Sequence, residues 1–517
     1  MIVGETLGVN LTAFLLFICI MLVLMIVKGI GKRKSTFPKD GNLKPVPGPP
    51  GLLLVGNIFD IDSNAQQKSM QRLAEKYGNI FQIRIFRTPV VVLNGYDAIS
   101  QALKHQAIDF AGRPHFHTFK VMHELKSGFL AFADYDETWK AGRKIAETAL
   151  KTFVSGRNVE SLDQRIGDEV RDLIAVLTDN NNTEGRVLEP STMIKLSVCN
   201  IMFSYMFGSR RSYSDSKLHD FLAMSHRFTN ATGTGNIIDF LPWLRFLPSK
   251  TMSDFKGIIL ELRDILSDDI KRHKENHVQG VSNNICDQLL NVSRSMNQSE
   301  LRKCNIDEER VMSSVYDMVG AAFDTISMSL TWSLVLMVNY PDVQAAVHDE
   351  LLRVVGHKTP TLKDKPSLPF TEACILETLR FITVVPFSIP HSTTRDTTLN
   401  GYFIPKGTTV FVNLHSVHHD KTRWVNPESF NPARFLSKDG SLDRQKVDQI
   451  MPFSAGRRRC LGSDLAKTEL FLFFSNLLHQ CHFESATAEK IPMEPIHGLT
   501  VRPKPFKLKI RPRFPGN

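Results

Sequence analysis

The chain has 517 residues, 42% of them hydrophobic, which is enough for a large buried core in one domain or two smaller ones. Its net charge of +10 suits anionic lipid or an acidic protein partner, and the lack of zinc-finger spacing or a long Lys/Arg run argues against nucleic acid. Seven scattered cysteines, without a C-x-x-C pair, exclude a disulfide framework and indicate a reducing compartment.

The N-terminus begins with an apolar run, Leu11 to Val27, close to the ~20 residues that a membrane-spanning helix needs. Basic residues follow between Lys28 and Lys34, whereas the leader carries only Glu5, so the positive-inside rule places the basic side in the cytosol. A cleaved signal peptide is the alternative, but it predicts a basic leader and a small-residue cleavage site. We expect residues 1–34 to be an uncleaved anchor, and a single one, because no later run reaches spanning length.

A proline-rich segment, residues 35–51, follows the anchor and contains PVPGPPG at 45–51. Proline fixes φ and removes a backbone donor, so the anchor helix cannot continue through it. We predict a stiff linker that sets the pose of the body against the bilayer. Residues 52–517 contain no long low-complexity stretch and no internal repeat, and we expect them to form one domain.

The body is predicted to be mainly helical with a smaller β portion. Val90–Leu93 before Asn94-Gly95 indicates a short strand and a turn, and 397–412 indicates a hairpin around Asn400-Gly401. Helical periodicity dominates from about 110 to 355, most clearly in Leu162–Leu177, Met252–Lys274 and Ile306–Asn339, and returns in Leu461–Leu478. Polar residues 180–184 and 276–284 are predicted loops, and short strands close the chain.

One cysteine stands in a context that favours chemistry. The run PFSAGRRRCLG places Cys460 after three arginines and at the start of an apolar helix. Cationic neighbours and a helix N-terminus lower a thiol pKa and favour the thiolate. Gly456 and Gly462 allow the backbone to approach a flat group, Phe453 can stack beside that group, and Arg458 can pair with an anion. A structural core cysteine is the alternative.

This run is similar to the cysteine signature F-x-x-G-x-R-x-C-x-G of the cytochrome P-450 family, with every fixed position present: Phe453, Gly456, Arg458, Cys460 and Gly462. The resemblance implies the cytochrome P-450 fold, a helical domain with small β-sheets. It also implies haem b (iron protoporphyrin IX) as the cofactor, Cys460 as the axial iron ligand and a monooxygenase reaction. The other four signature residues are then expected to contact the haem.

Glu377 and Arg380 stand three residues apart, on one face of a predicted helix. Alone, such a pair is an exposed ion pair of little energy. The resemblance implies instead a buried network with Arg434, from the downstream run NPARF, that locks the segment carrying the cysteine loop. We therefore expect these three residues to be structural supports of the haem site.

The run GAAFDT interrupts a long apolar helix with the polar pair Asp324 and Thr325. A polar pair there is costly unless it is used or satisfied, for example by a Thr that bonds back to the preceding turn. The resemblance implies catalysis: Thr325 holds a helix distortion open beside the iron, and Asp324 helps to deliver protons to dioxygen. Ala322 replaces the usual glycine, which puts the distortion in doubt.

Further residues resemble family contacts with the haem propionates. Trp139 and Arg143 lie one helical turn apart in a W-x-x-x-R pair, and His391 follows Ile389-Pro390. A lone histidine is more often a satisfied core or surface residue, and that alternative stays open for His391.

A finer resemblance, to the animal microsomal aryl hydrocarbon hydroxylases, is indicated by FAGRP at 110–114, by DFLP at 239–242 and by PHSTTRD at 390–396. It implies small, flat, lipophilic aromatic substrates in a pocket expected to include Phe228, Ala321, Phe323, Ile389 and Leu499. A dedicated steroid or fatty-acid hydroxylase is the main alternative. A haem-thiolate isomerase or a non-catalytic haem protein is a more distant one, which Asp324 and Thr325 argue against.

No flavin or nicotinamide fingerprint is present, so electrons must come from a partner. The resemblance implies NADPH–cytochrome P-450 reductase, with cytochrome b5 as a further candidate, and an endoplasmic reticulum location with the body facing the cytosol. An acidic flavoprotein could dock by charge complementarity on a basic surface, although a merely solvated basic face is the alternative. The expected docking residues are Lys140, Lys144, Arg457, Arg459 and Lys467.

Overall fold

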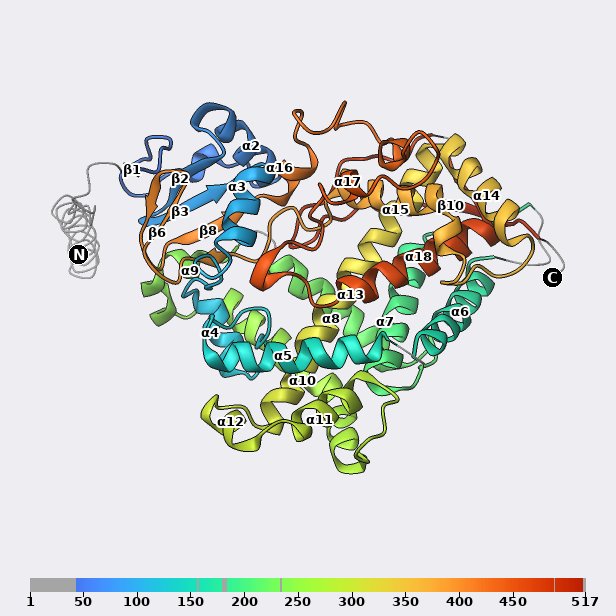
Figure 1. The fold of residues 1–517 in the computed structure, drawn as a ribbon, viewed down its shortest axis with the longest axis horizontal. Coiled ribbons are helices and arrows are strands. Elements are labelled where there is room, and N and C mark those ends of the chain that lie inside the picture. The colour runs from blue at the N-terminus through green and yellow to red at the C-terminus, as the bar shows by residue number, and fades with distance from the viewer. Residues whose placement is uncertain (1–42, 156–157, 179–183, 233–234, 488, 515–517) are drawn as a thin grey trace, which may run out of the picture.

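The computed structural model describes residues 43–155, 158–178, 184–232, 235–487 and 489–514, and the predicted anchor lies outside this part of the chain. Within it, the prediction of a mainly helical body with small sheets is confirmed (Figure 1). The longer helices are α2 (Gln66–Tyr77), α4 (His117–Glu124), α5 (Glu137–Phe153), α6 (Asn158–Leu177), α7 (Ser191–Phe207), α8 (Ser216–Thr232), α10 (Lys250–Asn276), α11 (Ile285–Ser295), α13 (Glu308–Asn339), α14 (Pro341–Val355), α15 (Pro369–Ile382) and α18 (Ser463–Gln480).

Shorter helical segments connect the longer ones. They are η1 (Ile58–Asp60), α3 (Tyr96–Ser100), η2 (Gln101–His105), α9 (Ile237–Phe240), η3 (Pro242–Phe246), α12 (Gln298–Lys303), η4 (Lys365–Ser367), α16 (Leu414–His418), η5 (Pro432–Phe435), α17 (Arg444–Val447) and η6 (Gly456–Arg458). The strands are β1 (Lys44–Pro45), β2 (Ile80–Ile85), β3 (Thr88–Leu93), β4 (Arg186–Leu188), β5 (His391–Ser392), β6 (Thr397–Leu399), β7 (Tyr402–Ile404), β8 (Thr409–Val412), β9 (Cys481–Ser485) and β10 (Leu508–Pro512).

The strands form three small sheets, in the orders β2-β3-β8-β5, β1-β7-β6 and β4-β10-β9. The predicted hairpin is present as β6–β7, where Asn400 and Gly401 both have positive φ (48° and 81°), as a two-residue type I′ turn requires. The prediction that this hairpin continues to residue 412 is wrong, because β8 is a separate strand that pairs in parallel with β3. Strand β4 interrupts the predicted helical stretch, since it pairs with β10 from the end of the chain.

The proline-rich segment lies against the body from residue 44 onward. Strand β1 pairs in parallel with β7, and the carbonyl of Pro47 accepts the backbone N–H of Gln82 at 2.7 Å. Any side chain at Gly48 would collide with that strand, because its Cβ would lie 1.9 Å from the carbonyl oxygen of Gln82. This part of the predicted linker therefore has a fixed place on the sheet.

Helix α13 lies in the middle of the helical region and contacts α5, α7, α11, α15 and α18 (Figure 1). It begins after Asp307, whose carboxylate accepts the backbone N–H of Arg310 at 2.7 Å. Contrary to the sequence expectation, this helix is long and apolar enough to span a membrane by length and composition. Of its most apolar window, however, 72% is buried among the other helices, so it is the core helix of the body.

Candidate active site

The cysteine loop runs between Phe453 and the start of α18. The backbone N–H of Cys460 donates to the carbonyl of Phe453 at 3.0 Å, which closes the loop on itself. Gly456 has φ 70°, and a Cβ there would lie 1.7 Å from the carbonyl oxygen of Leu103. At Gly456 the backbone therefore lies close to the backbone of Leu103, which leaves no room for a side chain. At Gly462, by contrast, a Cβ would meet open space.

Cys460 is exposed within this loop, at the N-terminal end of α18. The backbone N–H of Gly462 and the guanidinium groups of Arg143 and Arg459 lower its pKa, as the sequence predicts. Although this side chain reaches solvent, the protein packed around its sulfur acts in the opposite direction and is the larger effect, so the pKa of the thiol is raised. A coordinated metal ion deprotonates a thiol outright.

Arg458 is buried and holds a fixed position. Its Nε donates to the carbonyl of Ala111 and its Nη2 to that of Ala133, both at 2.8 Å, and the guanidinium lies 3.9 Å from the ring centroid of Trp139. Its Nη1 is buried without a hydrogen-bond partner. A buried guanidinium N–H without an acceptor is costly, so this atom marks a position for an anionic group.

Trp139 and Arg143 both lie at this site, and each donates a hydrogen bond to a backbone carbonyl of the protein. The indole N–H of Trp139 donates to the carbonyl of Leu130 at 2.9 Å, so it is not free for a propionate. The guanidinium of Arg458 lies over the ring of Trp139. Arg143 donates through Nη2 to the carbonyl of Arg459 at 2.6 Å and so braces the residue next to Cys460.

His391 is buried at the start of β5. Its Nδ1 lies 2.7 Å from the carbonyl oxygen of Phe110, which favours the tautomer with the proton on Nδ1. Burial and the nearby Arg113 and Arg458 hold the pKa of His391 well below its usual value, so the ring is neutral.

Arg113 is a cationic residue of this site that the residue-level prediction missed. Its Nε donates to the carbonyl of Ala131 at 2.8 Å, and its Nη1 to the carbonyls of Ile389 and Pro390 at 3.0 and 2.9 Å. Only the FAGRP motif pointed to it. Burial and the positive charge of Arg458 lower its pKa.

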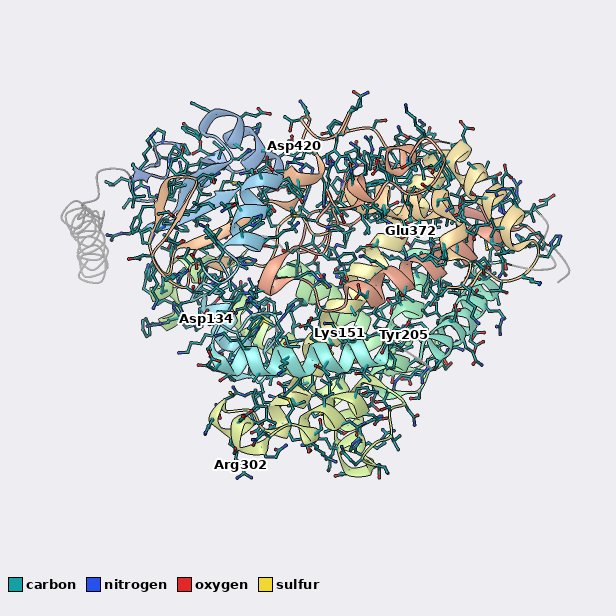
Figure 2. The ribbon with its side chains drawn as sticks, in the orientation of Figure 1. Asp134, Lys151, Tyr205, Arg302, Glu372 and Asp420 are labelled. Carbon is teal, nitrogen blue, oxygen red and sulfur yellow. The ribbon has the colours of Figure 1, made fainter. Side chains whose placement is uncertain are left out.

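The three guanidinium groups of Arg113, Arg143 and Arg458 together form a cation cluster. Burial lowers the pKa of Arg458 to about 9, with Arg143 adding to the effect and Asp134 opposing it. Figure 2 shows Asp134 near the start of α5, where its Oδ1 accepts the backbone N–H of Arg113 at 3.0 Å. Positive charge thus gathers beside the cysteine loop, and a cofactor with acidic side chains, such as haem with its propionates, fits this cluster.

Glu377, Arg380 and Arg434 form one buried network. Arg380 donates to both carboxylate oxygens of Glu377 at 2.7 and 2.9 Å, and the Nε of Arg434 donates to the same carboxylate at 2.9 Å. Arg380 also donates to the carbonyl of His418 at 2.6 Å, and the Nε2 of His418 accepts the backbone N–H of Met451 at 2.9 Å. The network thus reaches the residue before the cysteine loop.

Thr325 and Asp324 lie near the centre of α13, which is helical without interruption. The hydroxyl of Thr325 donates to the carbonyl of Ala321 at 3.0 Å, which is the back-bonded alternative that the sequence left open. Asp324 accepts the hydroxyl of Thr500, a contact that sequence reasoning missed because it joins residues far apart in the chain. The pKa of Lys195 on α7 is lowered by burial, and the charge of Asp324 partly offsets this effect.

A hollow lies beside this part of α13. Gly320 and Ala321 are exposed although most of the helix is buried, and a Cβ at Gly320 would meet open space. Leu499 adjoins Thr500, which bonds to the same helix, and the neighbouring Gly498 lies against Thr229 of α8. The structure therefore brings α8, α13 and the 498–500 segment together beside the hollow.

The aromatic residues predicted for the pocket differ in burial. Phe323 is 2% exposed and packs edge-on against Phe221 with ring centroids 5.1 Å apart, so its ring belongs to the α8–α13 contact. Phe228 is half-buried and stacks on Phe255 at 6.2 Å. Ile389 is half-buried and its carbonyl accepts a hydrogen bond from Arg113, which places it next to the cation cluster.

The surface beside the cysteine loop is basic and hollowed. A depression of about 1120 Å³ reaches from Trp139 and Phe453 across α5 to the start of α18. Figure 2 shows Lys151, one of its basic residues, on α5. The basic residues that line it are Lys104, Lys140, Arg143, Lys144, Lys151, Arg457, Arg459 and Lys467, against the acidic Glu147 and Asp448. All five residues predicted for docking line this one depression.

A cysteine before a buried helix, beside a guanidinium cluster with one unpartnered donor, fits the site of a haem-thiolate protein. Comparisons with known proteins agree. The cytochrome P450 family model matches residues 46–510, and the chain belongs to this family. It is therefore a cytochrome P450 monooxygenase with a haem-thiolate cofactor.

The similar proteins reported by these comparisons include members of family 1. Cytochrome P450 1B1 of Homo sapiens is 38% identical over 473 residues, which cover 90% of this chain and 86% of that protein. Cytochrome P450 1A1 of Oncorhynchus mykiss is 38% identical over 504 residues, or 96% and 94% of the two chains. Cytochrome P450 1A1 of Canis lupus familiaris is 36% identical over 500 residues, or 95% and 94%.

Proposed function

We propose that this monooxygenase oxidises small, flat, lipophilic aromatic compounds. The observation that carries the proposal is the similarity to family 1 proteins across nearly the whole chain, at 36–38% identity. The half-buried ring of Phe228, which stacks on Phe255, supports it, because a flat aromatic surface favours a flat aromatic ligand. When bound, the haem supplies the oxidant that is made from dioxygen, two electrons and two protons, and the second oxygen atom leaves as water.

The proposed substrate class is tested by competing a planar aromatic ether against a steroid. We expect kcat/KM for the ether to exceed that for the steroid by at least about tenfold, or ~1.4 kcal/mol. Products are analysed after turnover with isotopically labelled dioxygen, to show that the inserted oxygen atom comes from it. A preference for the steroid, or for a fatty acid added as a third substrate, would favour the dedicated hydroxylase instead.

We further propose that Cys460 is the axial ligand and that Arg458 and Arg143 hold the acidic side of the haem, with Arg113 completing the cluster. His391 and the ring of Trp139 shape this side, while Phe453, Gly456 and Gly462 form the loop beneath the haem. Glu377, Arg380 and Arg434 support that loop. Ala321, Phe228, Phe323, Ile389 and Leu499 are the proposed pocket residues.

Asp324 and Thr325 are the proposed proton-transfer residues. Replacing Thr325 with alanine is expected to lower product formed per NADPH by about tenfold or more and to raise hydrogen peroxide, because positioned proton transfer contributes roughly 10²–10⁴-fold. Thr325→Ser should retain most of the coupling. Product, peroxide and NADPH are measured in the same reaction.

The matched control is Thr331→Ala, because Thr331 is a buried threonine of the same helix that also bonds back, to the carbonyl of Ser327 at 2.7 Å. Its coupling should stay near that of the wild type. Unchanged coupling in Thr325→Ala, or equal loss in both variants, would refute a proton-transfer role for Thr325.

Electrons are proposed to come from NADPH–cytochrome P-450 reductase, with cytochrome b5 as a further donor, docked on the basic depression. The excess of basic over acidic residues there supports an acidic partner.

Residues 1–34 are the proposed membrane anchor and 52–517 the catalytic domain, held at the cytosolic face of the endoplasmic reticulum. Within the 35–51 linker, the segment from residue 44 onward lies on the sheet.

Exposed apolar side chains also support contact with a lipid bilayer. Phe59 is 80% exposed, and Trp243 and Phe246 are 50% and 75% exposed. Their segments are neighbours, because Ile61 and Phe240 pack against the same core cluster. Large exposed apolar groups of this kind mark an interaction surface.

A further inference from the structure

Residues 128–133 form a tight turn between α4 and α5. Gly128 has φ 75°, and its carbonyl accepts the backbone N–H groups of Phe132 and Ala133 at 2.9 and 3.2 Å. Phe129 and Leu130 pack their side chains into the main core cluster, and the peptide groups of the turn make further contacts with α5 and α13. On one side of the turn the peptide groups donate hydrogen bonds, and on the other side they accept them.

On one side of the turn, backbone N–H groups face Asp317 of α13. The N–H of Leu130 donates to Oδ2 of Asp317 at 2.5 Å. Hydrogen bonds from the N–H groups of Leu130, Gly128 and Ala131 lower the pKa of this carboxyl, although burial is the larger effect and raises it to about 7. One carboxyl group on the central helix therefore gathers donors from three positions of the turn.

On the other side of the turn, carbonyl groups face the cation cluster. Leu130 accepts the indole N–H of Trp139 at 2.9 Å, Ala131 accepts Nε of Arg113 at 2.8 Å, and Ala133 accepts Nη2 of Arg458 at 2.8 Å. The same short turn thus connects the carboxyl group of Asp317 with the residues that face the acidic side of the haem. Carboxyl oxygens accept on its N–H side and cationic or N–H donors bind on its C=O side, so each contact suits the local peptide dipole.

We propose that Asp317 is a positioning residue of the cofactor site: it fixes the 128–133 turn, whose carbonyls aim Arg113, Arg458 and Trp139 at the acidic groups of the haem. This rests on the proposed placement of those groups at the cation cluster. Asp317 lies eight residues before Thr325 on α13, so the helix that carries the proton-transfer pair also sets the haem's acidic side.

The test measures haem loss from the holoenzyme, by transfer to excess apomyoglobin. Asp317→Asn keeps the size of the side chain but removes its charge and turns one acceptor into a donor. We expect haem loss to become at least about tenfold faster, the equivalent of ~1.4 kcal/mol. Hydrogen exchange at the amides of Gly128, Leu130 and Ala131 should become faster in the same variant.

The matched control is Asp239→Asn. Asp239 is also a carboxyl whose pKa burial raises, to about 6, and it accepts the backbone N–H and the hydroxyl of Thr118 at 2.8 and 2.7 Å, away from the cation cluster. This variant should lose some thermal stability but should release haem at the wild-type rate. Haem loss that is no faster in Asp317→Asn than in Asp239→Asn overturns the proposal.

Two further variants separate the possible failures. If Arg458→Leu speeds haem loss and Asp317→Asn does not, only the role of Asp317 is overturned. If neither does, the proposed placement of the haem's acidic groups fails as well. Should Asp317→Asn not accumulate, Asp317→Glu, which keeps the charge, takes its place. Haem loss and hydrogen exchange at the turn amides should then both be faster than in the wild type, but by less than tenfold. Rates equal to those of the wild type would overturn the proposal.

Discussion

Replacing Cys460 with alanine is expected to abolish the band at about 450 nm in the reduced carbon-monoxide difference spectrum, together with monooxygenase activity. The sulfur at the head of α18 is the proposed iron ligand, and alanine offers no donor atom in its place. Neighbouring cations cannot substitute for it. The spectrum of the purified variant, with its haem content, is the measurement.

The control for this experiment is Cys304→Ala, because Cys304 is a half-buried cysteine remote from the cation cluster in sequence and element. Its spectrum should match that of the wild type. A Cys460→Ala variant that kept the full band would show that a different atom ligates the iron, and the assignment of the whole loop would then fall.

The second large effect is expected for Glu377→Gln. Both Glu377 and Arg380 are 0% exposed, and loss of the carboxylate charge leaves two buried guanidinium groups short of a counter-ion. Breaking a buried pair of this kind costs about 3–5 kcal/mol, against a total stability of roughly 5–15 kcal/mol for a typical protein. We expect a large fall in Tm and a marked loss of haem, because the network reaches Met451 and the cysteine loop.

Glu372→Gln provides the comparison within the same helix. Figure 2 shows Glu372 on α15, and its carboxylate lies 3.5 Å from Lys365, with both side chains about a quarter exposed. A pair of this kind contributes about 0–1 kcal/mol, so its loss should lower the Tm only slightly. Equal losses of Tm and haem in the two variants would contradict a specific role for the buried network.

Local sequence was a good guide to the helices of this fold. Three predicted helical segments match helices α6, α10 and α13 to within a few residues at their ends. They are Leu162–Leu177, Met252–Lys274 and Ile306–Asn339. Their apolar spacing reports which face is buried, and that information is local. The hairpin prediction went wrong at β8, because the sequence does not say which distant strand a segment will join.

For the candidate site, motif and geometry contributed differently. The signature around Cys460 identified the loop, the cofactor and the family before any contact was known. The motif did not reveal why Gly456 must be glycine, since the collision is with Leu103, which lies far away in sequence. Nor did it show that the N–H of Trp139 is already bonded to Leu130.

The sequence by itself determined which residues carry the chemistry, because a cysteine, its arginines and its helix start stand within one short run. Only the tertiary structure decided how charge is arranged around them. Arg113, Asp317 and Thr500 come from segments far apart in the chain, and their roles follow from hydrogen bonds to distant residues. Such bonds depend on where the backbone of another segment lies, and no local pattern of residues records that.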